Sequence, residues 1–229
     1  MSTISKRYIK NKELIEESEK YMVDEAISLL KKTGNAKFKE SIDVAINLGI
    51  DPKQTEQNVR GSVVLPNGTG KNMRVIVFAE SEDAETARTA GADEVGAEDL
   101  AEKIKAGFSD FDIVIATPSA MKIVGQLGQI LGPKGLMPNP KDGTVTKNIK
   151  EAVTNAKKGQ AMFRNDKGGV LHCSIGSVEF TEESIKENLL SLITQVNKSK
   201  PSTAKGIFIK KITLSSTMGP GIHVEESSI

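Results

Sequence analysis

Apolar and polar residues alternate strictly near the start of the chain, in a pattern typical of a sheet. Over residues 38–48, apolar side chains occupy alternate positions with polar residues between them, namely Phe38, Ile42, Val44, Ile46 and Leu48. Successive side chains of a strand lie on opposite faces, so the pattern predicts a long strand with one buried face. Before it, apolar residues at helical spacing predict an amphipathic helix that ends near Gly34. After it, residues 58–66 (NVRGSVVLP) predict a second strand that Pro66 closes.

The pattern changes from Met73 onward, where continuous apolar runs alternate with helical segments. MRVIVFAE and DIVIATP read as buried strands, DEVGA as a short one, and DAETARTAGA and LAEKIKAGF as helices. SAMKIVGQLGQIL predicts a further helix, GPKGLMPNPKDGTV a loop, and NIKEAVTNAKKG a last helix capped by Gly159. Strands that alternate with helices predict an α/β domain with a parallel sheet.

Strand-like alternation returns after Gly159. QAMFRN, GGVLHCSIG and AKGIFIKKITLSST read as strands, and one amphipathic helix (TEESIKENLLSLITQVNKSK) separates them. The predicted fold is therefore a split α+β domain (antiparallel sheet with helices) with an inserted α/β Rossmann-like domain, the two joined by a two-strand hinge. We predict that residues 1–67 and 160–229 form the discontinuous α+β domain and that residues 68–159 form the insert.

The amino-acid composition is consistent with two domains and limits the kinds of site that the chain can form. The chain has 229 residues, 38% of them hydrophobic and 27% charged, which suits a soluble globular protein. It has no apolar run of the roughly 18 to 20 residues that a bilayer span needs, and its start lacks the apolar core of a secretory signal, so a cytoplasmic location is expected. One cysteine and two histidines cannot form a disulfide or a tetrahedral zinc cage. We predict no metal, no cofactor and no membrane partner.

The net charge of +1 conceals a strong asymmetry. Residues 80–112 contain eleven acidic and three basic residues, a local charge of −8, so the rest of the chain carries +9. Charges act over about 10 Å at physiological salt, so these regions behave separately. A polyanion could bind only the basic part.

Three segments at the start of the insert or within it are candidate ligand or contact sites. PNGTGKN fails the phosphate-loop pattern at both ends, and a flexible turn explains its glycines. The residues after Glu80 include no glycine-rich turn for a pyrophosphate. The loop GPKGLMPNPKDGT, with Lys134 and Lys141, suits either a pre-organised contact surface or a plain connection, and both interpretations remain open.

Basic residues cluster in the predicted split domain. Lysines surround Phe38, Arg164 and Lys167 occur in FRNDKGG, and residues 198–211 contain five lysines without an acid. Contact with a phosphate backbone is the natural use of such clusters. Phe38 fits either the core face of the strand or an exposed position against nucleotides. His172 and Cys173 are neighbours in a strand and must face opposite sides, so we assign His172 no catalytic role.

Six blocks of the chain together resemble one protein family. They are, in order, VAINLGIDPKQTEQNVRGSVVLPNGTGK, AGADEVG, DIVIATP, LGPKGLMPNPKDGTV, FRNDKGG and STMGPG. In this order they are similar to the ribosomal protein L1 family of the bacterial large subunit, and they span nearly the whole chain. The resemblance implies a two-domain stalk protein that is not an enzyme. Such families are clearly basic, and the acid-rich insert accounts for this chain's near-neutral charge.

The resemblance also implies partners and residues. The split domain would anchor large-subunit ribosomal RNA at the mobile stalk of the cytoplasmic ribosome, beside the exit site from which deacylated tRNA is released. The same surface would bind the protein's own operon mRNA and repress translation. The matching motif positions are Lys37, Phe38, Lys39, Arg164, Asp166, Lys167, His172, Thr217, Met218 and Gly219. A tRNA-facing loop would use Lys134 and Lys141.

Two rival functions remain to be tested. A nucleotide-dependent enzyme using the α/β insert would need a phosphate-cradling glycine turn or a catalytic group that the sequence does not display. A protein-interaction module would leave the lysine-rich segment 198–211 as a solvated face. A monomer off the ribosome is the simplest expectation.

Overall fold

The chain folds into two compact units. The computed structural model describes residues 5–16, 19–80 and 82–228. One unit, the split unit, comprises Met1–Gly70 and Ala161–Ile229, and the other, the inserted unit, comprises Lys71–Gln160. The chain therefore passes from one unit to the other twice, and each unit is described here by itself.

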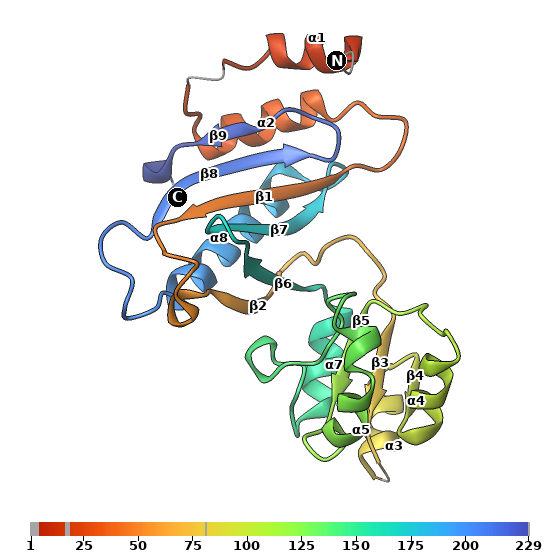
Figure 1. Cartoon of the computed structure of the whole chain (residues 1–229). Coiled ribbons are helices and arrows are strands. Elements are labelled where there is room, and N and C mark those ends of the chain that lie inside the picture. The colour runs from red at the N-terminus through yellow and green to blue at the C-terminus, as the bar shows by residue number, and fades with distance from the viewer. Residues whose placement is uncertain (1–4, 17–18, 81, 229) are drawn as a thin grey trace. The chain divides into compact units, whose positions relative to one another are not determined.

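The split unit contains a six-stranded sheet with the strand order β2-β6-β7-β1-β8-β9. Its centre is β1 (Ser41–Leu48), which pairs antiparallel with β7 (Val170–Ser177) and with β8 (Ile209–Ser216). Outside these lie β6 (Gln160–Asn165), the edge strand β2 (Arg60–Val64) and the short β9 (Ile222–Val224), as Figure 1 shows. The antiparallel sheet predicted from the sequence is confirmed, although β9 was not predicted.

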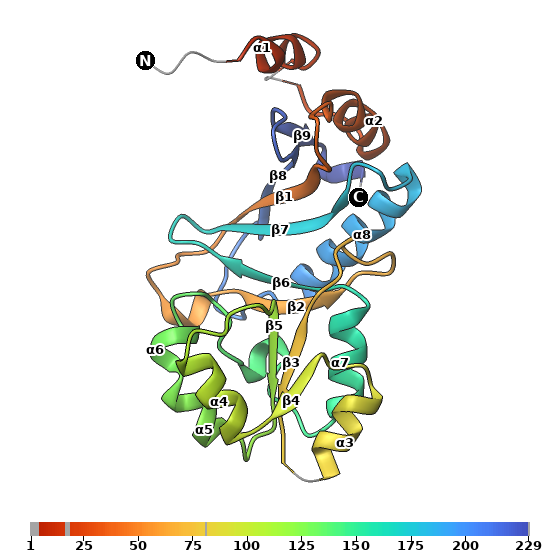
Figure 2. The ribbon, with the colours of Figure 1, turned by 90° about the vertical axis from the view of Figure 1, so that its right-hand side faces the viewer.

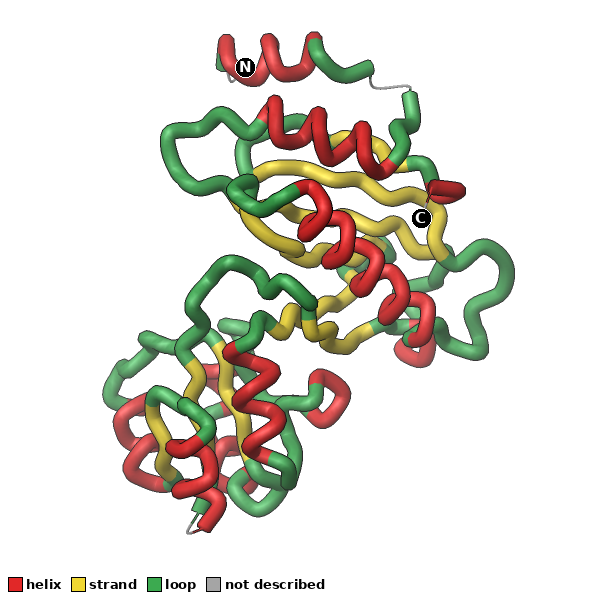
Figure 3. The backbone as a smooth tube through the Cα atoms, turned by 180° about the vertical axis from the view of Figure 1, so that it is seen from behind, coloured by secondary structure: helices red, strands yellow, loops and turns green. Residues whose placement is uncertain are grey.

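Helices cover one face of this sheet. α2 (Val23–Thr33) packs against β8 and β9, and α8 (Glu182–Lys198) packs against β7 and β2, on the same side (Figures 2 and 3). The Thr181 hydroxyl begins α8 by accepting a hydrogen bond from the Ser184 N–H at 3.2 Å. Alternate residues of β1 from Ile42 to Leu48 are buried under these helices, as their spacing predicts. Among the described residues of this unit, no helix lies on the other face, which is called the open face below.

The predicted opening helix is wrong in one respect, because two helices form instead of one. α1 (Lys6–Glu13) and α2 are separate, and between them Tyr21 forms an isolated parallel bridge with Val224 beside β9. The Tyr21 N–H donates to the His223 carbonyl at 2.9 Å, which holds the backbone extended and interrupts the helix. α1 docks through Asn11, whose amide donates to the Thr33 carbonyl at 2.8 Å. Residues 1–4, 17 and 18 of the predicted helix region lie outside the described residues.

The inserted unit contains a three-stranded parallel sheet in the order β4-β3-β5. Its strands are β3 (Val75–Phe78), β4 (Glu94–Gly96) and β5 (Ile113–Ala116). Val75 and Val77 pack toward α3 (Glu82–Thr89) and α7 (Ile149–Lys157), whereas Ile76 and Phe78 pack on the opposite face. That face is covered by α4 (Glu98–Lys105), α5 (Met121–Gln126) and α6 (Gly128–Leu131). Both faces are covered, which explains the continuous apolar runs.

The helix predicted over residues 119–131 is divided into α5 and α6. The division falls at Leu127, between Gly125 and Gly128, where two glycines weaken the helix. The described residues also form three single-turn 3₁₀ helices: η1 (Thr55–Gln57), η2 (Pro140–Asp142) and η3 (Glu226–Ser228).

Candidate nucleic-acid interface

A row of side chains crosses the open face of the split unit's sheet. The strand registers pair Arg164 with His172, His172 with Ala45, Ala45 with Thr213, and Thr213 with His223. The sequence neighbours of these residues, such as Phe163, Leu171 and Ile212, are buried on the helix-covered face. The row therefore lies on the open side, and both histidines of the chain belong to it.

The turn between β6 and β7 carries the first group of predicted residues, Arg164, Asp166, Lys167 and His172. The Asp166 Oδ1 atom accepts hydrogen bonds from the Gly168 and Val170 N–H groups, both at 2.8 Å. Its Oδ2 atom lies 3.8 Å from the His172 Nε2 atom. The hydrogen bonds from Val170 and Gly168, with the neighbouring His172 side chain, hold the pKa of Asp166 below its ordinary value. Asp166 is thus an anionic acceptor that shapes the turn, while Arg164 and Lys167 are exposed.

The second group of predicted residues comprises Lys37, Phe38 and Lys39 before β1 and Thr217, Met218 and Gly219 after β8. The buried carboxylate of Glu40 joins these two segments. Glu40 is only 3% exposed. One of its oxygens accepts a hydrogen bond from the Ala36 N–H at 2.8 Å, and the other accepts from the Ser216 hydroxyl at 2.7 Å and the Met218 N–H at 3.0 Å. Burial alone would raise the pKa of Glu40, but these hydrogen bonds and the charge of Arg7 lower it below its ordinary value.

Thr217 and Gly219 are fixed by this junction. The Thr217 Oγ1 atom accepts a hydrogen bond from the Ser41 N–H at 3.0 Å and lies 3.0 Å from the Ser41 hydroxyl. A Cβ atom on Gly219 would lie 2.5 Å from the Ser216 Oγ atom, closer than real Cβ contacts, so no other residue fits there unless Ser216 moves. The ends of β1 and β8 are thereby held together.

Two apolar side chains of the second group are exposed. Phe38 is 54% and Met218 49% exposed, so Phe38 does not belong to the core face. The alternation fails to reach it because β1 begins only at Ser41. Lys37 and Lys39 beside it are exposed, and the Lys39 Nζ atom lies 2.6 Å from a Glu179 carboxylate oxygen. A hollow of about 360 Å³ lies among these residues.

The two groups share one face of the sheet. Along β1, Ser41, which bonds Thr217, lies four positions before Ala45, which pairs with His172; this is about 13 Å at roughly 3.3 Å per residue. Between them the open face presents Asp43, which pairs with Ser174 and with Ser215. The surface between the groups is therefore polar, with hydrogen-bonding side chains.

The lysine-rich segment after α8 adds positive charge near this face. All five lysines of residues 198–211 are exposed, namely Lys198, Lys200, Lys205, Lys210 and Lys211. Lys211 lies in β8 two positions before Thr213 and pairs with Asn47, which places it on the open face. The positive charge thus reaches the sheet itself.

Lys134 and Lys141 are exposed on a braced loop of the inserted unit. The Asn139 side chain accepts a hydrogen bond from the Lys141 N–H at 2.9 Å, and the Asn139 N–H donates to the Thr144 hydroxyl at 2.8 Å. The Ala116 N–H donates to the Thr144 carbonyl at 2.9 Å, which ties the loop to β5. The structure brings these two lysines into one loop.

Sequence reasoning missed several residues that organise the split unit's open face. Glu40 was missed, although it precedes Ile42 by two positions and so lies on the buried side of the alternation. An acid at such a position signals an internal hydrogen-bond network. Thr213 and His223, whose Oγ1 and Nδ1 atoms lie 3.1 Å apart, were missed because β9 is too short to leave a pattern.

The remaining candidate groups offer little chemistry. Burial, with the nearby charge of Asp43, raises the pKa of Cys173 to about 12, so its thiol stays protonated at neutral pH. Within the described ranges, no three His, Cys, Asp or Glu side chains gather as a metal site would require. None of the helices described in the structure is long and apolar enough to cross a bilayer.

Comparison with known proteins supplies independent information. The model of the ribosomal protein L1p/L10e family matches residues 30–220. The chain is 57% identical to the large ribosomal subunit protein uL1 of Haemophilus ducreyi, over 100% of both chains. It is 57% identical to the protein of that name from Tolumonas auensis and 55% identical to that from Proteus mirabilis, over 100% of this chain and 98% of each relative.

Proposed function

The chain belongs to the ribosomal protein L1p/L10e family, and we propose on this basis that its split unit anchors ribosomal RNA of the large subunit. The relatives named above are proteins of the large ribosomal subunit, so the chain is a ribosomal protein rather than an enzyme. The proposed RNA segment is the mobile stalk beside the exit site for deacylated tRNA. The cellular location that follows is the large subunit of the cytoplasmic ribosome.

The open face of the sheet is the observation that carries this proposal. It joins the turn with Arg164 and Lys167 to the end where Thr217 and Met218 lie, without a helix between them. The basic groups neutralise phosphates, and exposed Phe38 and Met218 offer apolar contact to sugars and bases. Thr217, His172 and Asp166 can form hydrogen bonds with 2′-hydroxyls or base edges. This chemistry requires no metal or cofactor.

Filter retention of RNA by the full chain over a salt series tests the proposal. A stalk-type ribosomal RNA fragment is compared with a scrambled duplex of equal length. We expect the fragment to bind tightly and selectively, with an affinity that falls steeply with salt because phosphate contacts release counterions. Equal, weak binding of both RNAs would contradict the proposal.

The same open face supports a regulatory function. An RNA hairpin in the protein's own operon mRNA that imitates the ribosomal site would compete for the same residues, so free protein would repress its own translation. A competition assay with labelled ribosomal RNA and unlabelled mRNA leader tests this. Arg164→Glu should weaken both complexes by a similar factor, whereas a loss confined to one RNA would contradict a shared surface.

The braced loop of the inserted unit supports contact with exit-site tRNA. Lys134 and Lys141 are exposed, and the loop's hydrogen bonds reduce the entropy lost on binding. The double variant Lys134→Glu/Lys141→Glu should slow release of deacylated tRNA from reconstituted ribosomes and leave binding of the stalk RNA within about twofold.

Four features of the fold and assembly stay predictions. They are the domain limits at residues 67/68 and 159/160, the two-strand hinge, the Rossmann-like character of the insert and the monomeric state.

A further inference from the structure

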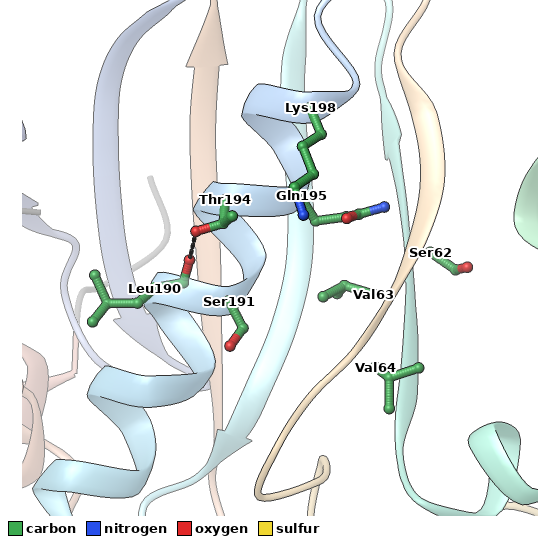
Figure 4. A pocket seen from close by; sticks show the side chains of 8 residues that line it. All are labelled: Ser62, Val63, Val64, Leu190, Ser191, Thr194, Gln195 and Lys198. Carbon is green, nitrogen blue, oxygen red and sulfur yellow. Dashed lines mark hydrogen bonds between the residues drawn. The ribbon is translucent and has the colours of Figure 1, made fainter.

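A groove borders the edge strand of the split unit, away from the open face. β2 lies at the end of the strand order, and α8 packs beside it. The groove between them measures about 510 Å³, within the range of ligand-binding sites (Figure 4). It is lined by residues 62–64 of β2 and by α8 residues one turn apart, Leu190, Thr194 and Lys198.

The backbone of β2 has hydrogen-bonding groups directed to this side. Val59 faces β6, because its carbonyl accepts a hydrogen bond from the Asn165 N–H at 3.1 Å and its N–H donates to the Asn165 side chain at 2.8 Å. The backbone N–H and C=O groups of successive residues point to alternate sides of such a strand. The backbone groups of Gly61 and Val63 therefore face β6, and those of Ser62 and Val64 face outward. In the described part of the chain no strand lies on that outer side. Such an edge is a template for a further strand.

The two ends of the groove carry charges of opposite sign. One end is braced by Asn67, whose N–H donates to the Asn188 side chain at 3.1 Å and whose amide donates to the Glu187 carboxylate at 2.8 Å. Lys198 lies at the other end, beyond Gln195 (Figure 4). β2 therefore runs from the Lys198 end toward the Glu187 end. An antiparallel strand placed beside it would end, at its own C-terminus, near Lys198.

Apolar surface is available at the edge beside Val64. Val64 is 41% exposed, and because its neighbour Val63 is buried on the α8 side, the Val64 side chain lies on the opposite face of the sheet. An aliphatic side chain of an added strand that lies beside Val64 would remove apolar surface from water.

From these features we propose that the groove binds an extended peptide of a partner protein, which adds antiparallel to β2 as a seventh strand. An aliphatic side chain of the peptide packs against Val64, and the acidic C-terminal end of the peptide pairs with Lys198. Arg164 and His172 lie on the open face rather than beside α8, so the peptide and RNA can be bound together.

Titration of the isotope-labelled full chain with a synthetic peptide, followed by amide NMR, tests this proposal. The probe is acetyl-Thr-Val-Thr-Val-Thr-Glu with a free C-terminus. We expect saturable shifts at Ser62, Val64 and residues 190–198 below about 2 mM peptide. Absence of these shifts, or shifts confined to other regions, would overturn the proposal. Concentration-dependent shifts at Ser62 and Val64 without peptide would assign the edge to a second copy of the chain instead.

Two matched comparisons separate strand addition from weak general binding. A probe with N-methylated valines, and the variant Ser62→Pro, should each lower the affinity at least about tenfold, because proline removes an outward N–H without disturbing the ladder. If Ser62→Pro fails to fold, the N-methylated probe alone decides. The variant Lys198→Glu should bind a probe ending in lysine more tightly than the probe ending in glutamate. The variant Lys200→Glu should leave the preference for the probe ending in glutamate unchanged. Equal affinity for the plain and N-methylated probes would overturn the proposal.

Discussion

The inserted unit covers both faces of its sheet with helices, whereas the split unit leaves one face open. The helices of the inserted unit therefore form much of its outer surface, and α3 and α4 contain six of the eleven acidic residues of segment 80–112. The split unit instead presents strands, with Arg164, His172 and Lys211 on the uncovered side. A net charge of +1 thus hides a chain in which one unit is suited to a polyanion and part of the other repels it.

The largest effect should come from Glu40, which has a counterpart in the inserted unit. Glu40→Ala leaves the Ser216 hydroxyl and two backbone N–H groups without their buried acceptor, which should lower the free energy of unfolding by about 3 kcal/mol. Asp93→Ala is the matched control, because Asp93 similarly bonds the Val75 N–H and Lys157 but is 42% exposed. It should cost about 1 kcal/mol, since solvent screens the lost charge. Urea unfolding measures the free energy of unfolding of both variants. Equal losses would contradict the difference expected between the buried and the exposed carboxylate.

Charge reversal on the open face should have the next largest effect. Arg164→Glu should lower affinity for the stalk-type RNA by about 10- to 30-fold and reduce the salt slope, because a phosphate contact becomes a repulsion. Lys122→Glu makes the same charge change at an exposed position of the inserted unit. It should change affinity less than about twofold at 0.15 M salt. Filter retention that found equal losses would indicate a nonspecific effect of net charge.

Acid should weaken both units through these carboxylates. The pKa values of Glu40 and Asp93 are held below their ordinary values by hydrogen bonds and positive charges that outweigh burial. Their stabilisation is complete above the ordinary values of about 4.3 and 3.9, and it is lost as the pH falls through the lower folded values. Urea unfolding at pH 6 and pH 3 should show a smaller decline in Glu40→Gln than in the parent chain. An identical decline in the variant and the parent chain would exclude Glu40 as a source of the loss of stability in acid.

The smallest effect should follow neutralisation of the acidic helix. The triple variant Glu98→Gln/Asp99→Asn/Glu102→Gln removes three charges from α4. RNA affinity should rise at most about threefold at low salt and be unchanged at 0.3 M salt, where the Debye length is about 6 Å. A larger rise that persists at high salt would indicate that α4 contacts the RNA.

The sequence predicts an element correctly where a hydrophobic pattern repeats. It does not where a single tertiary contact determines the limits of the element. The alternation from Ile42 to Leu48 and the run from Val75 to Phe78 correctly predicted one-sided and two-sided burial. The opening helix was predicted too long, because the bridge between Tyr21 and Val224 joins residues about 200 positions apart.

The candidate site shows the same division. Motif resemblance selected Thr217 and Gly219, and the close approach of Gly219 to Ser216 explains why a glycine is needed. The network of Glu40 could not be foreseen in the same way, because its partners come from loops separated by about 180 residues. Phe38 remained ambiguous until the start of β1 at Ser41 was known. Short strands such as β9 leave no periodicity to detect.

The pairing of β1 has a consequence for the order of events during synthesis. β1 is complete at Leu48, but its partners β7 and β8 end at Ser177 and Ser216. At about 5 to 20 residues per second, β1 waits roughly 6 to 26 s for its first neighbour, while the contacts of the inserted unit are nearer in sequence and can form earlier. The open face is thus among the last surfaces to form. A nascent chain that stops before β8 would contain Arg164 and His172 yet would lack the sheet that aligns them with Thr217.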